Sequence, residues 1–469
     1  MPGPRKIFAA ILLALFLAAS SLPPAKTSAQ SAQRKSVILL IADDQGLDLG
    51  CYGNTAIKTP NLDKLAGRGV RFTNAYATVA SCSASRAVML TGLYTHSNGQ
   101  YGHAHDYHNL HLHKWVEPLP QLLKKNGYAT GLIGKFHVNP AAQFGWDMLQ
   151  EGAARDVYAM AQKAGEFFAQ AKDKPFYLHV GFADPHRAAK GFANRPDYPG
   201  VQPIKYSPAQ VRVPYHLPDK PEVREELAEH YEAISRLDQG VGLVLDALKA
   251  AGRDKDTLII YLSDNGIPFP GAKTTLYDAG VRLPLIVYSP EQKKNGSVNH
   301  AMVSWVDLVP TILDWTGSKG PSYQLPGRSF LPILEEESPR GWDEVYVSHL
   351  FHEITMYYPM RGVRTRQFKY LVNLFPELEF PHASDLFGSP SWQGILKRKD
   401  RMMGERPVRA YLHRPAEELY DLNSDPNELK NVASDPKYAG ALKDLRQRLL
   451  DWRKRTKDPW LILLQQNGQ

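Results

Sequence analysis

Four short apolar segments, each ending abruptly in polar residues, constrain the fold of this chain more than any other feature. They are 36–44 (SVILLIADD), 127–137 (GYATGLIGKFH), 176–187 (FYLHVGFADPHR) and 257–266 (TLIIYLSDNG). Continuous runs rich in Ile, Val, Leu and Tyr are typical of strands buried on both faces of a parallel sheet. Helices are predicted between them, beginning near Pro60, near Pro120 and near Pro221. This alternation predicts an α/β fold with helices on both faces of the sheet.

The pattern changes at about residue 342. The segments EVYVSHL, VRTRQFKYLVNL and EELYDL predict shorter strands, and 436–455 predicts a terminal helix. We therefore expect a larger catalytic domain over 34–340 and a smaller α+β domain over 341–469.

The N-terminus is typical of a secretory signal peptide. Arg5 and Lys6 precede an apolar run over 7–19, and the small-residue sequence TSA follows at 27–29. A membrane anchor is the alternative, but the run is short for a membrane span. We expect residues 1–29 to be removed and the mature chain to be periplasmic or secreted, with no stable membrane span.

Charge and cysteine content restrict the partners only weakly. The chain carries a formal net charge of +8, and removing residues 1–29 removes three basic residues and no acidic one. A mildly basic protein suits an anionic partner or simply has a basic surface, and we expect no nucleic-acid partner. Two cysteines, Cys51 and Cys82, make no disulfide scaffold, although they could pair with each other. A homodimer remains an open alternative to a monomer.

Polar side chains follow the four predicted strands at the edge where ligands bind in such sheets. They are Asp43, Asp44, Lys135, His137, Asp184, His186, Arg187, Asp264 and Asn265. The carboxylates of Asp43, Asp44 and Asp264 and the amide oxygen of Asn265 are hard ligands, which favour Ca²⁺ or Mg²⁺ over zinc. The basic groups, together with Lys273, could cradle a tetrahedral oxyanion such as sulfate or phosphate. A single strand end of this kind could be a turn device, but four together favour a site.

Several motifs occur in an order that resembles one enzyme family. CSASRAVMLTG at 82–92 resembles the sulfatase signature C-x-P/A-S-R, in which a helix begins just after the cysteine, and GYATGLIGKFH resembles the second signature. ADD, TPNLDKLA, SDNG and ELYDLNSDPNELKNVA match the same family in order. The chain thus resembles the sulfatase family over nearly all of its expected mature length. The resemblance implies an alkaline-phosphatase-like fold, with a large mixed, mostly parallel sheet flanked by helices and a smaller C-terminal α+β domain.

The resemblance also implies roles for individual residues. Cys82 would be oxidised to formylglycine, whose hydrate is the nucleophile, and Arg86 would hold that residue. The cation, Ca²⁺ or alternatively Mg²⁺, would be bound by Asp43, Asp44, Asp264 and Asn265, with residue 82 adjoining it. Sulfate binding and proton transfer would fall to Lys135, His137, His186 and Lys273, with His137 as base and His186 as acid. Ala84 stands where many signatures have Pro, which leaves open which maturation enzyme modifies Cys82.

Further segments resemble the sulfamidase branch of the family, which removes the N-sulfate of N-sulfoglucosamine in heparin and heparan-type glycans. They include SNGQYG, DPHR, SDNGIPFP and HEITMYYPMR. We expect the substrate to contact Asp184, Arg187, Asp106, His108, His352, Glu353 and Arg361. The histidine-rich run 96–113 contains no HExxH motif and no cysteine, so a pocket rim is favoured there over a zinc site.

Three alternatives remain to the N-sulfatase interpretation. One is an O-sulfatase that acts on sulfated sugars or aryl sulfates. Another is a phosphodiesterase or phosphonate hydrolase of the same superfamily. A non-catalytic heparin-binding protein is disfavoured, because a binding module needs no nucleophile, metal ligands and acid–base groups together.

Overall fold

The computed structural model describes Met1 and residues 35–461. Apart from Met1, the predicted signal peptide lies outside the described residues. Within the part of the chain that is described, no helix combines the length and hydrophobicity needed to cross a membrane.

An eight-stranded sheet with the order β4-β3-β5-β1-β6-β7-β2-β8 forms the centre of the protein. Its strands are β1 (Ser36–Ala42), β2 (Val70–Tyr76), β3 (Ala129–Gly134), β4 (Met148–Gln150), β5 (Phe176–Gly181), β6 (Thr257–Ser263), β7 (Arg282–Tyr288) and β8 (Ser297–Ser304). Strand β7 runs antiparallel to β6 and β2, and the other neighbours are parallel. The predicted mixed, mostly parallel sheet is confirmed.

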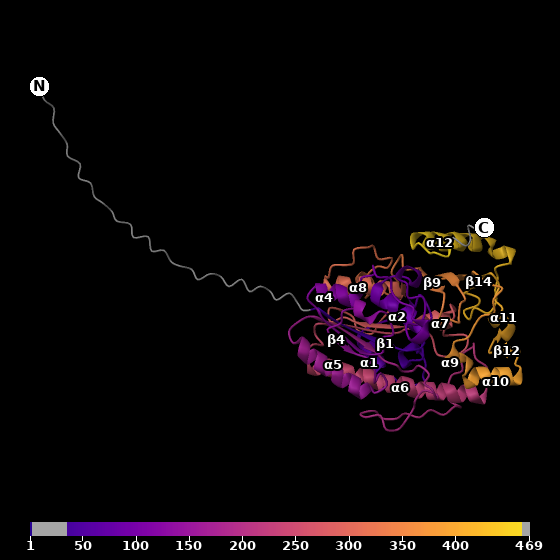
Figure 1. Ribbon diagram of the computed structural model, residues 1–469, viewed down its shortest axis with the longest axis horizontal. Coiled ribbons are helices and arrows are strands. Elements are labelled where there is room, and N and C mark those ends of the chain that lie inside the picture. Colours follow the sequence, from indigo (N-terminus) through magenta and orange to yellow (C-terminus); the bar gives the residue numbers. More distant parts are fainter. Residues whose placement is uncertain (2–34, 462–469) are drawn as a thin grey trace. The chain divides into compact units, whose positions relative to one another are not determined.

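Helices cover both faces of this sheet (Figure 1). One face carries α1 (Pro60–Arg68), α5 (Val157–Ala171) and α6 (Pro221–Ala250), and the other carries α2 (Cys82–Thr91), α4 (Leu119–Lys125) and α8 (Leu308–Thr316). Two short helices, α3 (Thr95–Asn98) and α7 (Asp278–Val281), lie in connections.

The side chains of β1 explain why this strand is apolar from Val37 onward. Val37, Leu39 and Ile41 pack into the hydrophobic core beneath α2, α4 and α8. Ile38 and Leu40 pack into a second core beneath α1, α5 and α6. Because successive side chains of a strand point to opposite faces, a strand between two helical layers must be apolar at every position.

The register of the central strands brings their carboxyl ends together. Ile41 of β1 pairs with Gly181 of β5, Ala42 pairs with Ser263 of β6, and Gly134 of β3 pairs with Gly181. A Cβ atom on Gly181 would lie 2.1 Å from the Lys135 carbonyl oxygen, so only glycine allows this close approach. The polar residues that follow these strands therefore meet at one edge of the sheet.

A separate antiparallel sheet with the order β14-β11-β10-β9 forms in the C-terminal region. Its strands are β9 (Glu344–His349), β10 (Met360–Thr365), β11 (Phe368–Asn373) and β14 (Glu417–Asp421). The surrounding elements are α9 (Ser384–Phe387), α10 (Pro390–Arg398), β12 (Met402–Met403), β13 (Arg406–Pro407), α11 (Val408–Leu412) and α12 (Ala439–Arg455).

The segment VRTRQFKYLVNL, expected as one strand, is instead part of a hairpin. Its residues form the end of β10 and all of β11, and these two strands pair with each other. The Thr365 hydroxyl donates to the carbonyl oxygen of Phe368 and accepts from its backbone N–H. A polar stretch between two apolar runs was the available signal for this turn.

The residues from Lys35 onward form one compact unit. Tyr346 and Trp452 of the C-terminal region belong to the same hydrophobic core as α2 and β1. The division into domains at 340 and 341 stays a proposal.

Candidate active site

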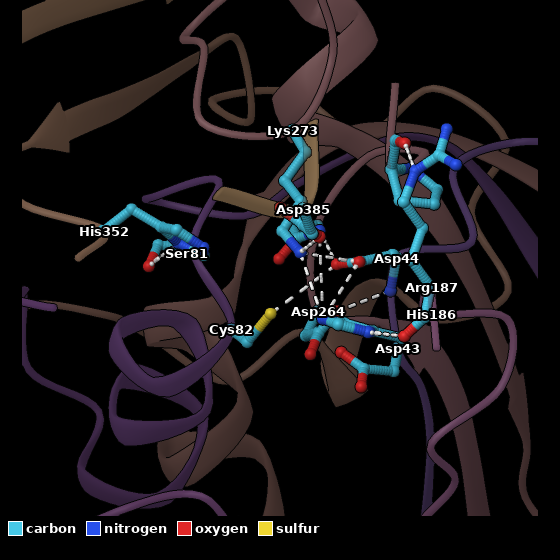
Figure 2. A network of polar contacts seen from close by, with 12 residues as sticks. Asp43, Asp44, Ser81, Cys82, His186, Arg187, Asp264, Lys273, His352 and Asp385 are labelled. Atoms are coloured by element: carbon cyan, nitrogen blue, oxygen red, sulfur yellow. Dashed lines mark hydrogen bonds and ion pairs between the residues drawn. The ribbon is translucent and has the colours of Figure 1, made fainter. Parts of the chain in front are cut away.

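Cys82 is the first residue of α2 and is completely buried. Its Sγ lies 3.5 Å from Asp44 Oδ1 (Figure 2). Burial and the neighbouring Asp44 carboxylate raise the pKa of the thiol well above its usual value. Cys51 and Cys82 are both free thiols, so the disulfide considered from the sequence is not formed. The predicted helix start at this motif is confirmed.

Residues from the ends of β1, β3, β5 and β6 surround Cys82. We define the strand-end cluster as Asp43, Asp44, Lys135, His186, Asp264 and Asn265. The Asp44 backbone N–H donates to Asp264 Oδ1 at 3.0 Å, and Asn265 Nδ2 donates to Asp44 Oδ1 at 2.6 Å. Ligand atoms of Asp43, Cys82 and Asp264 all lie within 4.8 Å of one another.

The electrostatics of the strand-end cluster suit an additional cation. Burial and the adjacent Asp43 raise the pKa of Asp264 to about 8. Burial also acts to raise the pKa of Asp43, but Lys135, His186 and Arg86 outweigh it and hold that pKa well below its usual value. Among the described residues, Asp43 Oδ1 and Asn265 Oδ1 are buried without a hydrogen-bond partner. These unpaired hard oxygens fit Ca²⁺ or Mg²⁺.

Arg86 joins α2 to two strand ends. Its Nε donates to Asp264 Oδ2 at 2.9 Å, and one terminal nitrogen donates to the Lys135 carbonyl oxygen at 3.0 Å. A second terminal nitrogen lies 3.8 Å from Asp43 Oδ1. The Lys135 ammonium in turn donates to Asp43. The positive charges of Lys135, which follows β3, and Arg86, on α2, thus compensate the buried carboxylates of Asp43 and Asp264.

Lys273 and His186 both approach Asp44 (Figure 2). Lys273 Nζ lies 2.8 Å from Asp44 Oδ2 and 3.2 Å from His186 Nε2. His186 Nδ1 lies 2.5 Å from the Arg187 carbonyl oxygen, which directs Nε2 into the cluster. Burial and the nearby Lys273 charge lower the pKa of His186. Ligand atoms of Asp44, Cys82 and His186 lie within 4.8 Å of one another.

Asp385 is a site residue that sequence reasoning missed. It lies on α9, in the C-terminal region, and its Oδ2 accepts from Lys273 Nζ at 2.8 Å and lies 3.8 Å from His186 Nε2. Burial opposes ionisation, but Lys273 and His186 lower the pKa of Asp385 to about 2. The segment PHASDLF around it carries no strand-end pattern, so no local signal marked it.

Two of the predicted substrate contacts already have partners within the protein. The buried Asp184 carboxylate accepts from Arg155 at 2.6 Å and from Arg236 at 2.7 and 2.8 Å. Arg187 donates to Glu226 and to the Pro268 carbonyl oxygen. Both residues flank His186 and anchor the loop that carries it.

The segment HEITMYYPMR divides between two places. His352 Nδ1 lies 2.9 Å from the hydroxyl of Ser81, the N-cap residue of α2, and Glu353 Oε1 accepts from the backbone and side chain of Ser384. Arg361 is fully buried and donates to both carboxylate oxygens of Asp458, at 2.8 and 2.9 Å. None of its described hydrogen bonds is to a residue of the strand-end cluster. A guanidinium buried within β10 requires a carboxylate partner of its own, and Asp458 supplies it.

Five histidine rings lie beside α2, and we call them the histidine rim. The rim consists of His103, His105, His108, His137 and His352, with neighbouring ring centroids 3.9 to 5.6 Å apart. His137 follows β3, and its Nε2 lies 2.6 Å from His105 Nδ1. His108 Nδ1 accepts from the Ile354 N–H at 3.0 Å. Asp106 is exposed and lies 3.8 Å from His105.

A cavity of about 380 Å³ opens beside the histidine rim. Its lining includes His105, Lys135 and His137. The rim is therefore reached from solvent, while Cys82 behind it is enclosed.

Comparisons with known proteins agree with this architecture. The Sulfatase family model matches residues 35–318, and the model described as "N-sulphoglucosamine sulphohydrolase, C-terminal" matches 272–393. The chain is 42% identical over 468 residues to the N-sulphoglucosamine sulphohydrolase of Homo sapiens, covering 92% of each protein. It is 31% identical over 437 residues to an ulvan-active sulfatase of Formosa agariphila, covering 92% of this chain and 82% of that protein. The chain belongs to the sulfatase family.

Solved structures agree at the level of the fold. A structure in complex with its substrate, D-glucosamine-2-N,6-O-disulfate, matches with a TM-score of 0.66 and 22% identity, covering 91% of this chain and 98% of that one. The phosphonate monoester hydrolase of Silicibacter pomeroyi matches with a TM-score of 0.65 and 20% identity, covering 90% and 96%. The predicted alkaline-phosphatase-like fold is thereby confirmed.

Proposed function

We propose that this sulfatase hydrolyses the N-sulfate of N-sulfoglucosamine at the non-reducing end of heparin or heparan-type glycans. The observation that carries the proposal is the 42% identity to N-sulphoglucosamine sulphohydrolase along 92% of both chains. The match of residues 272–393 to the C-terminal model of that enzyme supports it, because this stretch includes Lys273, His352 and Asp385.

We assign the nucleophile to residue 82, after a maturation enzyme has converted Cys82 to formylglycine. The hydrated aldehyde supplies an oxygen nucleophile that attacks sulfur. The N-terminus of α2 favours negative charge at residue 82, through its unpaired backbone N–H groups. Arg86 fixes the position of this helix start by its bonds to Asp264 and the Lys135 carbonyl oxygen.

Asp43, Asp44, Asp264 and Asn265 would hold one divalent cation, Ca²⁺ or alternatively Mg²⁺, beside residue 82. When bound, such an ion polarises a sulfate oxygen and favours ionisation of the nucleophile. Lys135 and Lys273 add fixed positive charge on either side of the carboxylates, where the sulfate group would lie.

Proton transfer to the departing amine would fall to His186. Cleavage of the N–S bond expels an amine, which is a poor leaving group unless its nitrogen receives a proton. The Arg187 carbonyl oxygen accepts from Nδ1, so Nε2 faces the Lys273 ammonium at 3.2 Å, and His186 would pass a proton to the amine through Nε2 with Lys273 as its source. We assign His137 to accept the proton of the second hydroxyl of hydrated residue 82, so that sulfate leaves and the aldehyde is restored, with His105 as the hydrogen-bond partner of His137.

The histidine rim and the loop after β9 would contact the sugar. His108 and His352 belong to the histidine rim, Glu353 follows His352 in the loop after β9, and Asp106 is exposed beside His105. A wrong substrate would leave such polar groups buried without a hydrogen-bond partner, so these groups discriminate strongly between substrates. We further propose export through the N-terminal segment 1–29.

Two measurements test the proposed function. The first is sulfate release from N-sulfoglucosamine, compared with glucosamine 6-O-sulfate and an aryl phosphonate monoester under matched conditions. We expect clear preference for the N-sulfate, and a preference for the 6-O-sulfate or the phosphonate would reject it. The second is mass spectrometry of the peptide that contains residue 82. Active enzyme with only a thiol at this position would reject the formylglycine mechanism.

A further inference from the structure

Three histidines of the rim are arranged as metal ligands, apart from the strand-end carboxylates. One ring nitrogen from each of His103, His105 and His137 lies within 4.8 Å of the other two. Two of these nitrogens, His105 Nδ1 and His137 Nε2, are 2.6 Å apart. In a tetrahedral zinc shell, nitrogens at the usual bond length lie about 3.3 Å from each other, so small side-chain movements suffice.

The protonation state of these side chains suits a metal. Burial lowers the pKa of His103 to about 2, and it lowers the pKa of His137 well below its usual value. Burial also lowers the pKa of His105, since it outweighs the opposing effect of the nearby Asp106 carboxylate. Imidazole binds metals in its neutral form, and a lowered pKa favours that form at neutral pH.

Supporting contacts hold the His103 ring and the loop that carries it. His103 Nδ1 lies 3.5 Å from the Ser83 hydroxyl on α2, which leaves its other nitrogen for a ligand. The backbone of His103 donates to the His352 carbonyl oxygen, and Ala104 donates to Ser83, so the loop is tied at both positions. Outer contacts of this kind orient histidine ligands in metal sites.

We propose that His103, His105 and His137 form a second metal site, which takes a borderline divalent cation such as Zn²⁺ and inhibits the enzyme when filled. Imidazole nitrogens select Zn²⁺, Cu²⁺ or Ni²⁺, whereas the oxygen ligands of the strand-end cluster select Ca²⁺ or Mg²⁺. The two sites share no ligand. A cation in the second site occupies the His137 nitrogen that the proposed reaction uses, and the 380 Å³ cavity gives it access from solvent.

The test uses the purified full chain with Ca²⁺ in excess, so that the strand-end cluster is not available to the probe. Binding of Zn²⁺ is measured by equilibrium dialysis, and binding of Co²⁺ by its visible absorption. We compare the wild type with His105→Ala, which changes a partly exposed side chain, and with His111→Ala, an exposed histidine of the same run outside the trio. We expect one site in the wild type and in His111→Ala, and at least about tenfold weaker binding in His105→Ala.

Inhibition is then measured as the rate with Zn²⁺ relative to the same variant without it. The wild type and His111→Ala should be inhibited at the Zn²⁺ concentration that fills the site, and His105→Ala only at concentrations at least about tenfold higher. Equal Zn²⁺ binding by the wild type and His105→Ala would overturn the proposed site. Binding that is lost in His105→Ala while inhibition is unchanged would overturn the inhibitory role. The dialysis result does not depend on the substrate proposed above.

Discussion

The strand-end cluster and the C-terminal region contribute to the same site by different physical routes. The strand-end residues follow β1, β3, β5 and β6, so the sheet register alone brings them together. The C-terminal region contributes Asp385 through α9, and it holds Arg361 inside β10 with Asp458. The comparison teaches that charges directly after the central strands, such as Asp43 and Asp264, can meet in one site, whereas a charge within a buried strand, such as Arg361, serves the fold.

The largest expected effect is that of Asp264→Ala, which removes a proposed cation ligand and the partner of Arg86. Sulfate release should fall at least about 10³-fold, with loss of the bound cation. Rates on N-sulfoglucosamine and elemental analysis of the protein measure both. Asp197→Ala, which changes an exposed carboxylate paired with Arg195, is the control. Wild-type metal content and rate in Asp264→Ala would contradict the proposed role of the cluster.

Arg361→Ala should act on stability instead. Removing one partner of a buried ion pair leaves Asp458 with a single remaining cation, Arg453, and should lower the free energy of unfolding by about 3–5 kcal/mol. The kcat/KM of the folded enzyme should stay within about twofold of the wild type. Denaturant unfolding and steady-state kinetics measure the two quantities.

The control for Arg361 is Arg366→Ala, which removes an exposed ion pair with Asp343. It should change the free energy of unfolding by no more than about 1 kcal/mol. If Arg361→Ala instead raised KM strongly at unchanged stability, Arg361 would contact substrate as the sequence suggested.

Asp385→Asn tests whether the C-terminal region takes part in the reaction. The change removes the charge that holds Lys273 and faces His186, so kcat should fall about 10- to 10²-fold while the melting temperature changes little. Asp400→Asn, which alters a carboxylate paired with Arg398 in the same region, should leave kcat unchanged. A wild-type kcat in Asp385→Asn would show that Asp385 takes no part in the reaction.

The smallest expected effect is a pH dependence of the Arg361 result. Burial opposes ionisation of Asp458, but Arg361 outweighs it and holds the pKa of Asp458 well below its usual value. A depressed carboxyl pKa contributes stability that is present above the unfolded pKa of about 3.9 and is lost as the pH falls below it. The stability difference between the wild type and Arg361→Ala should therefore narrow by about 1 kcal/mol between pH 5 and pH 3. Parallel unfolding curves at the two pH values measure it, and a constant difference would mean that Asp458 is not the partner that matters.

The sequence predicted the elements whose signals are local. Apolar runs specified the central strands, and the polar residues directly after them, such as Asp43 and Asp264, necessarily lie at the sheet edge. The start of α2 at Cys82 followed from its motif. Asp385 and the Arg361–Asp458 pair could not be predicted in this way, because they depend on how loops separated by tens or hundreds of residues pack together. The hairpin between β10 and β11 was missed because its turn contains neither Gly nor Pro.

Under the maturation proposed above, the complete burial of Cys82 imposes an order of events on folding and modification. A modifying enzyme must bring its reactive groups to the thiol, and in the folded protein α2 and the surrounding core leave no room for them. The interval for modification therefore closes when the core forms around α2. A chain that folds faster than it is modified would be trapped with a thiol at residue 82, correctly folded and inert. Slower folding would raise the active fraction, so that specific activity would report on folding speed as well as on catalysis.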